Sequence, residues 1–357
     1  MAFTIGDRIK LTIFGQSHAP SIGGVIDGLP AGETIDLDAA TAFLARRSPG
    51  KSPLATARKE TDVPRVIAGL ADGKTCGAPL AFFIENHDTR SKDYDLFRAQ
   101  PRPSHADFPA ILKYGDAHDI RGGGFFSARL TAALCFAGAI ALQILARRGI
   151  VIGAHIARAA GIADTPFDPV NLTKEDFSSL NDFPVIDKIQ GEKMQKAIIS
   201  AKKDGDSVGG VVECGIIGLP AGLGEPIFDS MESQLARMLF AIPAVKGVEF
   251  GTGFAIADMM GSAANDVYTE PQGDSLRTLT NNNGGILGGL STGMPLIFRA
   301  AFKPTPSIAR KQNTWNTHSG KQETLVIPGR HDPCVVLRAV PCVKAAAGIV
   351  VLSCSTV

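Results

Sequence analysis

Hydrophobic and polar positions along the first third of the chain predict short strands joined by turns. Residues 8–14 alternate polar and apolar side chains, which is the pattern of a strand with one buried face. Ile22–Asp27 is a second such run and ends at the turn sequence GLPAG, residues 28–32. The same reasoning predicts further strands at residues 63–70, 78–84, 151–156 and 209–217, and helices at residues 37–47, 192–203 and 229–241.

The most apolar stretch of the chain is Leu130–Ala146, with the sequence LTAALCFAGAIALQILA. A helix that spans a membrane needs about 20 such residues. This run is shorter, contains Gln143 and is closed by Arg129, Arg147 and Arg148. A helix that is apolar on all sides in a soluble protein lies at its centre. We therefore predict a buried core helix and no membrane association.

The pentapeptide GLPAG occurs twice, at residues 28–32 and 218–222, and each copy follows a predicted strand led by GGV. Chance recurrence of a common turn is one explanation, but we favour an internal duplication. Strands and helices occur in blocks instead of strict alternation, which indicates an α+β layered fold and not a doubly wound sheet. Since no low-complexity linker divides the chain, we expect a single domain of residues 1–357.

Composition narrows the class of protein. Of 357 residues, 45% are hydrophobic and 20% are charged, as in an average globular protein. The net charge of +1 argues against a general binder of nucleic acid or membrane surfaces, so an anion site must come from local clusters of Arg and Lys. The six cysteines form no CxxC pair, and the N-terminal MAFTIGDRIK has no apolar signal segment. We therefore expect a reduced, cytoplasmic protein.

Several familiar site motifs are absent or incomplete. GLADGKT at residues 69–75 has too few residues between its glycines for a phosphate loop, and CGAP follows where a helix is required. GGILGG at residues 284–289 has the wrong spacing for a dinucleotide fingerprint, so its glycines face either a ligand or a neighbouring strand. The sequence contains no HExxH, and its seven histidines lack the spacing of zinc ligands, so we predict no metal site.

Three segments join a histidine to turn residues and other polar groups. They are GQSH at residues 15–18, RPSHAD at residues 102–107 and GRHDP at residues 329–333. A lone histidine in a loop is usually a solvated surface residue, but three such segments bracketed by Gly or Pro favour a site. Since histidine transfers protons well near pH 7, these segments indicate acid–base chemistry.

Arginines beside turns and element ends indicate that the ligand is an anion, because a guanidinium group grips phosphate or carboxylate with two parallel hydrogen bonds. KPTPS at residues 303–307 adds a cation and two hydroxyls, which suits a phosphate, although an ordinary Pro-rich turn has the same sequence. Two readings stay open from the residues alone: a lyase or transferase acting on a phosphorylated carboxylic acid, and a non-catalytic anion-binding or assembly protein. The arginines are Arg46, Arg47, Arg102, Arg121, Arg129 and Arg330.

Ten segments, in order along the chain, resemble the chorismate synthase family. They are the GQSH segment, ARRSPG (45–50), ENHDTRSKDY (85–94), RPSHAD (102–107), RGGG (121–124), AGLGEPIFD (221–229), AVKGVEFGTGF (244–254), NGGILGGLSTG (283–293), KPTPSI (303–308) and GRHDPC (329–334). The resemblance implies an α+β fold in which sheets sandwich central helices, and a homotetramer. It also implies a lyase of the shikimate pathway that eliminates phosphate in a trans-1,4 sense from 5-enolpyruvylshikimate-3-phosphate to give chorismate.

The resemblance further implies a requirement for reduced FMN without net redox change, in which the flavin donates an electron transiently and its N5 receives the hydrogen. His105 matches the histidine thought to protonate the leaving phosphate, and His18 matches the one that manages the proton of the reduced flavin. Ser17 and Asp332 match residues near the flavin N5.

Other matched residues would contact the cofactor or the substrate. The FMN contacts match Ser127, Ala244, Gly288, Lys303, Pro304, Thr305, Pro306, Ser307 and Arg330. Arg47 matches a position assigned to substrate or NADPH contact, and Arg46, Arg121 and Arg129 are our candidates for holding the substrate's carboxylates and phosphate.

Three departures from the family pattern affect these assignments. The usual GESHG is GQSHA, which removes an acidic group beside His18, and the usual RGGGRSSARE is RGGGFFSARL. At Phe125 and Phe126 we therefore expect FMN contacts through the backbone only. A second arginine often found in the family is Pro53 in this chain, which weakens the case for an NADPH site. We therefore expect a monofunctional enzyme that takes FMN already reduced by a separate flavin reductase.

Overall fold

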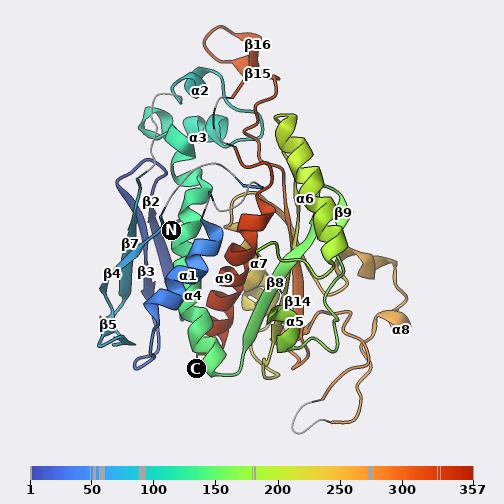
Figure 1. Cartoon of the computed structure of the whole chain (residues 1–357). Coiled ribbons are helices and arrows are strands. Elements are labelled where there is room, and N and C mark those ends of the chain that lie inside the picture. The colour runs from blue at the N-terminus through green and yellow to red at the C-terminus, as the bar shows by residue number, and fades with distance from the viewer. Residues whose placement is uncertain are drawn as a thin grey trace.

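Two antiparallel sheets enclose a layer of helices, which gives the α+β sandwich that the sequence predicts (Figure 1). The computed structural model describes residues 2–48, 50, 54–55, 61–87, 94–178, 180, 182–271, 276–327, 329 and 331–356. The first sheet has the order β1-β2-β3-β7-β4, and the second has the order β11-β14-β10-β8-β9. The strands of the first sheet are Thr4–Ile5, Lys10–Gly15, Ser21–Asp27, Leu80–Glu85 and Pro64–Ala68, and those of the second are Val245–Phe250, Leu296–Phe302, Gly210–Ile217, Val151–Ala159 and Ile162–Ala163, each in sheet order.

The helix layer lies between the two sheets, and its two long helices are apolar on nearly all sides. It contains α1 (Leu37–Arg47), α4 (Thr131–Arg147), α7 (Met231–Phe240) and α9 (Val336–Cys354). The segments Ala128–Arg147 and Val336–Cys354 are long and apolar enough to cross a membrane, but 78% and 83% of their most apolar windows are buried inside the protein. The prediction of a core helix at residues 130–146 is therefore confirmed.

The two sheets are built alike, as an internal duplication requires. In sheet order, β2-β3-β7-β4 corresponds to β8-β10-β14-β11, and α1 and α4 correspond to α7 and α9. The two GLPAG turns end β3 and β10, and the first glycine of each has a positive φ, 85° at Gly28 and 81° at Gly218. A hydroxyl donates to the proline carbonyl of each turn, from Thr75 in the first copy and from Ser291 in the second.

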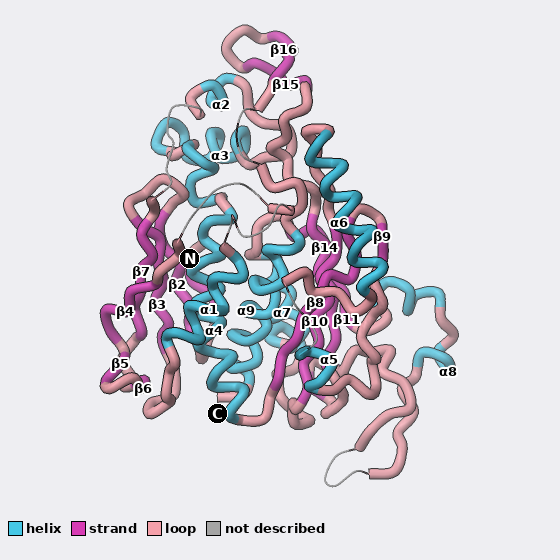
Figure 2. The backbone as a smooth tube through the Cα atoms, viewed as in Figure 1, coloured by secondary structure: helices cyan, strands magenta, loops and turns pink. Residues whose placement is uncertain are grey.

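The remaining described elements lie outside this frame. They are β5 (Leu70–Ala71), β6 (Lys74–Thr75), α2 (Leu96–Ala99), α3 (Asp107–Tyr114), α5 (Lys174–Ser178), α6 (Lys188–Lys203), α8 (Gly261–Ala264), β12 (Ile286–Leu287), β13 (Leu290–Ser291), β15 (Gln312–Asn316) and β16 (Lys321–Leu325), with short 3-10 turns between them. Figure 2 shows that the end of the sandwich near α2, α3, β15 and β16 consists largely of loops.

Candidate active site

Two long connections meet at that end of the sandwich. Residues 86–130 join β7 to α4, and residues 303–335 join β14 to α9, so the two segments occupy corresponding places in the two halves. Lys303 Nζ donates to the carbonyl of Ser104. Thr314 Oγ1 donates to the carbonyl of Pro101 at 2.6 Å, and Thr317 N donates to that of Ala99 at 2.9 Å. The duplicated frame therefore places both connections against one another.

A glycine turn in the first connection lies against the predicted catalytic residues. Gly122, Gly123 and Gly124 all have positive φ, at 58°, 84° and 55°. A Cβ at Gly122 would lie 2.3 Å from Ser17 Oγ and 2.6 Å from His18 Cε1, and one at Gly123 would lie 3.3 Å from His105 Cε1.

Backbone contact fixes the same arrangement, because Ser17 N donates to the carbonyl of Gly124 at 3.0 Å. Only glycine combines this backbone conformation with such close neighbours. The turn therefore brings Ser17, His18 and His105 together.

His105 is oriented by a buried ion pair. Its Nδ1 lies 2.7 Å from Asp107 Oδ1, and Arg102 donates to both oxygens of Asp107 at 2.7 Å. Burial alone would raise the pKa of Asp107, but the hydrogen bonds from Arg102 and His105 hold that pKa well below its usual range. The ionised carboxylate accepts the Nδ1 proton, so the Nε2 atom faces Gly123. Arg102, which the sequence marks as an anion ligand, instead positions His105.

Two residues that sequence reasoning did not single out hold the GQSH loop. Asn86 Nδ2 donates to the carbonyls of Gln16 at 3.1 Å and Ala19 at 2.8 Å. The ring of Tyr94 meets the ring of His18 edge-on, with centroids 5.3 Å apart. Both belong to the ENHDTRSKDY segment, so the only signal in the sequence was that segment's resemblance to the family.

The KPTPS turn forms the second wall of the site. Lys303 N donates to the carbonyl of Ala244 at 2.9 Å, and Ser207 Oγ donates to the carbonyl of Thr305 at 2.7 Å. Burial, with a contribution from the nearby charge of Lys246, lowers the pKa of Lys303. Among the described residues, none is a hydrogen-bond partner of the buried Thr305 Oγ1 atom. Pro304 is exposed, and Pro306 and Ser307 are half-buried beside it.

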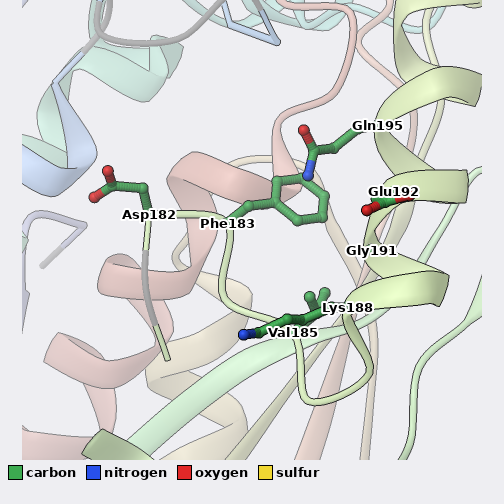
Figure 3. Close-up of a pocket in the computed structure, with 7 residues that line it drawn as sticks. All are labelled: Asp182, Phe183, Val185, Lys188, Gly191, Glu192 and Gln195. Atoms are coloured by element: carbon green, nitrogen blue, oxygen red, sulfur yellow. The ribbon is translucent and has the colours of Figure 1, made fainter. Parts of the chain in front are cut away.

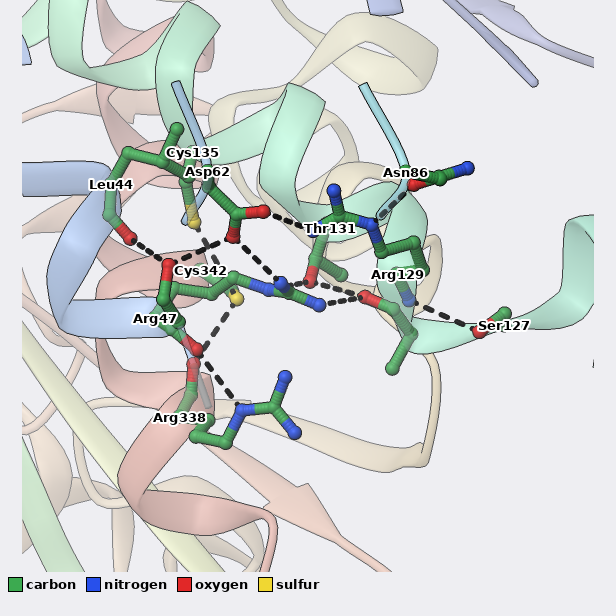
Figure 4. Close-up of polar contacts among 12 residues, drawn as sticks. Leu44, Arg47, Asp62, Asn86, Ser127, Arg129, Thr131, Cys135, Arg338 and Cys342 are labelled. Atoms are coloured by element: carbon green, nitrogen blue, oxygen red, sulfur yellow. Dashed lines mark hydrogen bonds and ion pairs between the residues drawn. The ribbon is translucent and has the colours of Figure 1, made fainter. Parts of the chain in front are cut away.

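Arg47 and Arg129 share one buried carboxylate beneath the site (Figure 4). Arg47 is 2% exposed and donates to Thr131 Oγ1 at 3.0 Å, to Asp62 Oδ2 at 3.3 Å and to the carbonyl of Ala128 at 2.8 Å. Arg129 pairs with the other oxygen of Asp62. Burial would raise the pKa of Asp62, but the two guanidinium groups lower it. The side chain of Arg47 is therefore engaged inside the protein.

Asp332 joins the same cluster through Arg338. Arg338 Nη1 pairs with Asp332 Oδ2, and Arg338 Nε donates to the carbonyl of Arg47 at 3.0 Å. The cluster thus contains three arginines, at 47, 129 and 338, and two aspartates, at 62 and 332, which leaves one positive charge in excess. Neither Asp62 nor Arg338 was predicted, because nothing in their local sequence marks them.

The remaining predicted ligands lie in different surroundings. Arg46 is exposed in the last turn of α1, and Arg121 is exposed and forms a two-pronged pair with Asp119 at 2.7 and 2.9 Å. Ser127 accepts a hydrogen bond from Arg129 N at 3.2 Å.

Gly288 lies in the turn between β12 and β13, and backbone contacts join that hairpin to residues 222–231. Arg330 and Pro53 lie outside the described residues.

Phe125 turns its side chain into an aromatic cluster. Its ring centroid lies 5.6 Å from that of Phe3, 5.3 Å from that of Tyr114, 5.5 Å from that of His118 and 4.7 Å from that of Phe126. The ring is thus packed against protein, and the backbone of the turn is what this position offers to a ligand.

A cavity of about 550 Å³ lies elsewhere, between α6 and the loop before it (Figure 3). Its lining residues all belong to the segment 182–195, and none is a predicted site residue. It offers Asp182, Lys188 and Glu192 around Phe183 but no histidine or arginine. This cavity therefore brings together none of the residues that the sequence predicts for the site.

Comparisons with known proteins agree on one family. A sequence model of the chorismate synthase family matches residues 9–355. Chorismate synthases of Lancefieldella parvula and Porphyromonas gingivalis are both 44% identical to the chain, over 99% and 96% of its length and 96% and 92% of theirs. The chorismate synthase of Methanococcoides burtonii is 43% identical, over 98% of this chain and 94% of its own. A crystal structure of a chorismate synthase has the same fold, with a TM-score of 0.76 at 24% identity over 98% of this chain and 92% of that one.

Proposed function

The chain belongs to the chorismate synthase family, and from that premise we propose that it converts 5-enolpyruvylshikimate-3-phosphate to chorismate and phosphate by a trans-1,4 elimination that requires reduced FMN. The observation that carries the proposal is the convergence of Ser17, His18 and His105 on one glycine turn. Lys303 reaches the same connection by donating to Ser104. A carbon–oxygen lyase needs a proton donor beside the leaving phosphate, and His105 at this turn would be that donor.

The residues present fit a flavin phosphate and ring. The Lys303 cation and the Thr305 hydroxyl, which has no partner among the described residues, suit a phosphate, and the glycines at 122–124 let Ser17, His18 and His105 approach the backbone against which a flat ring would lie. Ser307, Ala244 and the backbone around Phe125, Phe126 and Ser127 would complete the contacts. When bound, reduced FMN would supply a transient electron for the elimination and take up the hydrogen, with no net redox change.

The side chains of the protein divide the proton transfers. His105, held by Asp107 through Nδ1, donates a proton from Nε2 to the departing phosphate oxygen, and Asp107 stabilises the charged ring. His18, against Gly122, holds the proton that balances the charge of the reduced flavin. Asp332, oriented by Arg338, accepts the proton that must leave the site.

Exposed arginines supply the grip on the substrate. Arg121 and Arg46 are accessible and are the candidates for direct contact with its carboxylates, whereas Arg47 and Arg129 share Asp62 inside the protein and Arg47 also donates to Thr131 at the start of α4. Contact of NADPH with Arg47 is disfavoured because that side chain is buried and paired. We therefore propose a monofunctional enzyme, supplied with FMN by a separate flavin reductase in the cytoplasm.

A homotetramer would cover the exposed apolar surface. Ile227, Phe228, Phe254 and Met260 are 76%, 88%, 84% and 77% exposed, and exposed apolar groups of this size mark interaction surfaces. Light scattering on the purified protein tests this part of the proposal, and a monomeric mass would contradict it.

Anaerobic turnover tests the proposed function. Purified protein with photoreduced FMN and 5-enolpyruvylshikimate-3-phosphate should release phosphate and chorismate in equal amounts, and NADPH with oxidised FMN should give negligible turnover. If FMN binds but neither product appears, the chain is the non-catalytic anion-binding protein that the residues alone also allow. Equal rates with NADPH would show that the flavin reductase function is present.

A further inference from the structure

The two central helices carry a pair of thiols where they pack together. Cys135 of α4 and Cys342 of α9 are 0% and 3% exposed, and their sulfur atoms lie 3.6 Å apart. One turn further along each helix, a Cβ at Gly138 would lie 2.3 Å from the Cβ of Ala345, so the backbones touch. This close packing holds the two sulfurs at one spacing.

The groups around Cys342 lower the pKa of its thiol, and the protonated thiol donates to the carbonyl of Arg338 at 3.3 Å. The pKa of Cys342 is lowered, first by the hydrogen bond from the Cys135 thiol and then by Arg47, Thr131 and Arg338, which together outweigh burial (Figure 4). Burial raises the pKa of Cys135. A reactive cysteine sits in a positive and partly exposed environment, whereas a structural buried cysteine is inert. Cys342 shares the positive environment but is only 3% exposed. Cys214 is the matched comparison, because it is fully buried in β10 and its pKa is raised.

We propose that Cys342 and Cys135 are a peroxide-reactive dithiol that closes to a disulfide between α4 and α9. The Cys342 thiolate attacks one oxygen of hydrogen peroxide, which breaks the O–O bond and gives a sulfenic acid and hydroxide. Hydroxide takes up the proton that Cys342 lost and becomes water. The Cys135 thiol then attacks the sulfenic sulfur and expels a second water. Two thiols and one peroxide thus give one disulfide and two waters.

Oxidation of the Cys135–Cys342 pair would affect the proposed flavin chemistry through Arg338 and Asp332. Reduced FMN that meets dioxygen yields oxidised FMN and hydrogen peroxide, so this source of oxidant rests on the proposed function, whereas the thiol chemistry does not. Closing the bond draws the sulfurs to about 2.05 Å. That movement shifts Cys342 relative to the carbonyl of Arg338, now 3.3 Å away, and Arg338 holds Asp332. Turnover should therefore fall on oxidation and return on reduction.

Peroxide treatment of the full-length protein, without FMN, tests the proposal. Free thiols are alkylated after unfolding, and intact mass and peptide mapping report their state. We expect the mass to fall by two hydrogens before alkylation and a single cross-linked peptide pair containing Cys135 and Cys342, formed at least about ten-fold faster than any change at Cys214. Oxidation confined to the exposed Cys76, with Cys135 and Cys342 still alkylated, would overturn it.

Two variants and a control separate the chemical roles. Cys135→Ser should leave the sulfenic acid of Cys342 open to trapping by dimedone, and Cys342→Ser should abolish reaction at Cys135. Cys214→Ser should form the disulfide at the wild-type rate. Dimedone trapping at Cys135 in the Cys342→Ser variant would reverse the assigned order and contradict the proposal. If either variant fails to fold, as judged by circular dichroism, the wild-type peptide map decides alone.

Discussion

The two connections that build the site occupy corresponding positions in the duplicated frame, yet they supply different chemistry. The β7–α4 connection carries His105, its partners Arg102 and Asp107, and the glycine turn. The β14–α9 connection carries Lys303 and Thr305 at one end and Asp332 at the other. The frame thus brings the two connections together, and under the proposed function the first would supply the proton donor while the second would hold the flavin phosphate and supply the proton acceptor Asp332.

Loss of the proton donor in the first connection should have the largest effect. His105→Ala should lower turnover by about 10²- to 10⁴-fold while FMN binding survives, because proton transfer by a positioned group contributes that much. Stopped-flow turnover and flavin fluorescence measure the two quantities. His87→Ala, at an exposed histidine paired with Glu85, is the control and should keep full activity. Parallel loss of FMN binding and turnover would make His105 a structural residue.

The buried cluster of Arg47, Arg129, Arg338, Asp62 and Asp332 should contribute to the free energy of unfolding. Arg47→Met removes one partner of the buried Asp62 and should lower the free energy of unfolding by about 3–5 kcal/mol, the scale for breaking a buried pair. Arg121→Met breaks an exposed pair with Asp119, so its effect should stay within about 1 kcal/mol. Urea unfolding measures both. Similar losses for the two variants would show that the buried cluster is no more important than a surface pair.

Removal of the cation in the second connection should weaken binding more than chemistry. Lys303→Ala should raise the dissociation constant of FMN by a factor that corresponds to about 1.5–3 kcal/mol, the scale of a charge-assisted hydrogen bond. Turnover at saturating FMN should change less. Lys246→Ala, at the neighbouring exposed lysine, is the matched control with a smaller expected effect. An unchanged dissociation constant for Lys303→Ala would reduce the KPTPS turn to a scaffold.

The second sheet contains a buried histidine that the first sheet lacks, and its effect should be the smallest. His155 lies between Asp164 Oδ2 at 3.0 Å and Glu213 Oε2 at 2.9 Å. Burial alone would lower the pKa of His155, but the two carboxylates raise it above the ordinary value of 6.5. A raised folded-state pKa stabilises the protein fully below the unfolded pKa, and this stabilisation is lost as pH rises through the folded value.

Wild-type protein should therefore lose stability above pH 6.5 with a slope from this group of at most about 1.4 kcal/mol per pH unit. His155→Gln should remove that part of the slope, and His318→Gln, at an exposed histidine, should leave it in place. Unfolding free energies measured across pH 6 to 9 decide the matter. An identical pH profile for wild type and His155→Gln would mean that His155 is uncharged in the fold.

The sequence predicts the first half of the fold better than the second. Periodicity locates α1 to the residue and α4 to within one residue at each end, and the repeated GLPAG points to the duplication. It does not reveal α9, because Arg338, Pro341 and Lys344 interrupt the apolar run of that helix. β11 and β14 are missed as well: β11 is an edge strand with one buried residue, and β14 is buried on both faces along most of its length, so neither has a clear alternation.

The sequence also predicts only part of the candidate site. Histidines flanked by Gly or Pro are visible in the sequence, and so is the glycine turn. The ion pairs are not visible in the sequence. Asp62, Arg47 and Arg129 come from three separate segments of the chain, so no local pattern shows that they pair. The sequence therefore identifies arginines without showing that two of them already share one carboxylate inside the protein.

The central claim is that one site lies where the two connections meet, against the glycine turn. An experimental structure with reduced FMN and 5-enolpyruvylshikimate-3-phosphate tests it most directly. We predict the flavin ring against Gly122–Gly124, the flavin phosphate at Lys303 and Thr305, and the substrate phosphate within hydrogen-bond distance of His105 Nε2. FMN bound in the cavity lined by Phe183 and Lys188, with the glycine turn empty, would contradict the account.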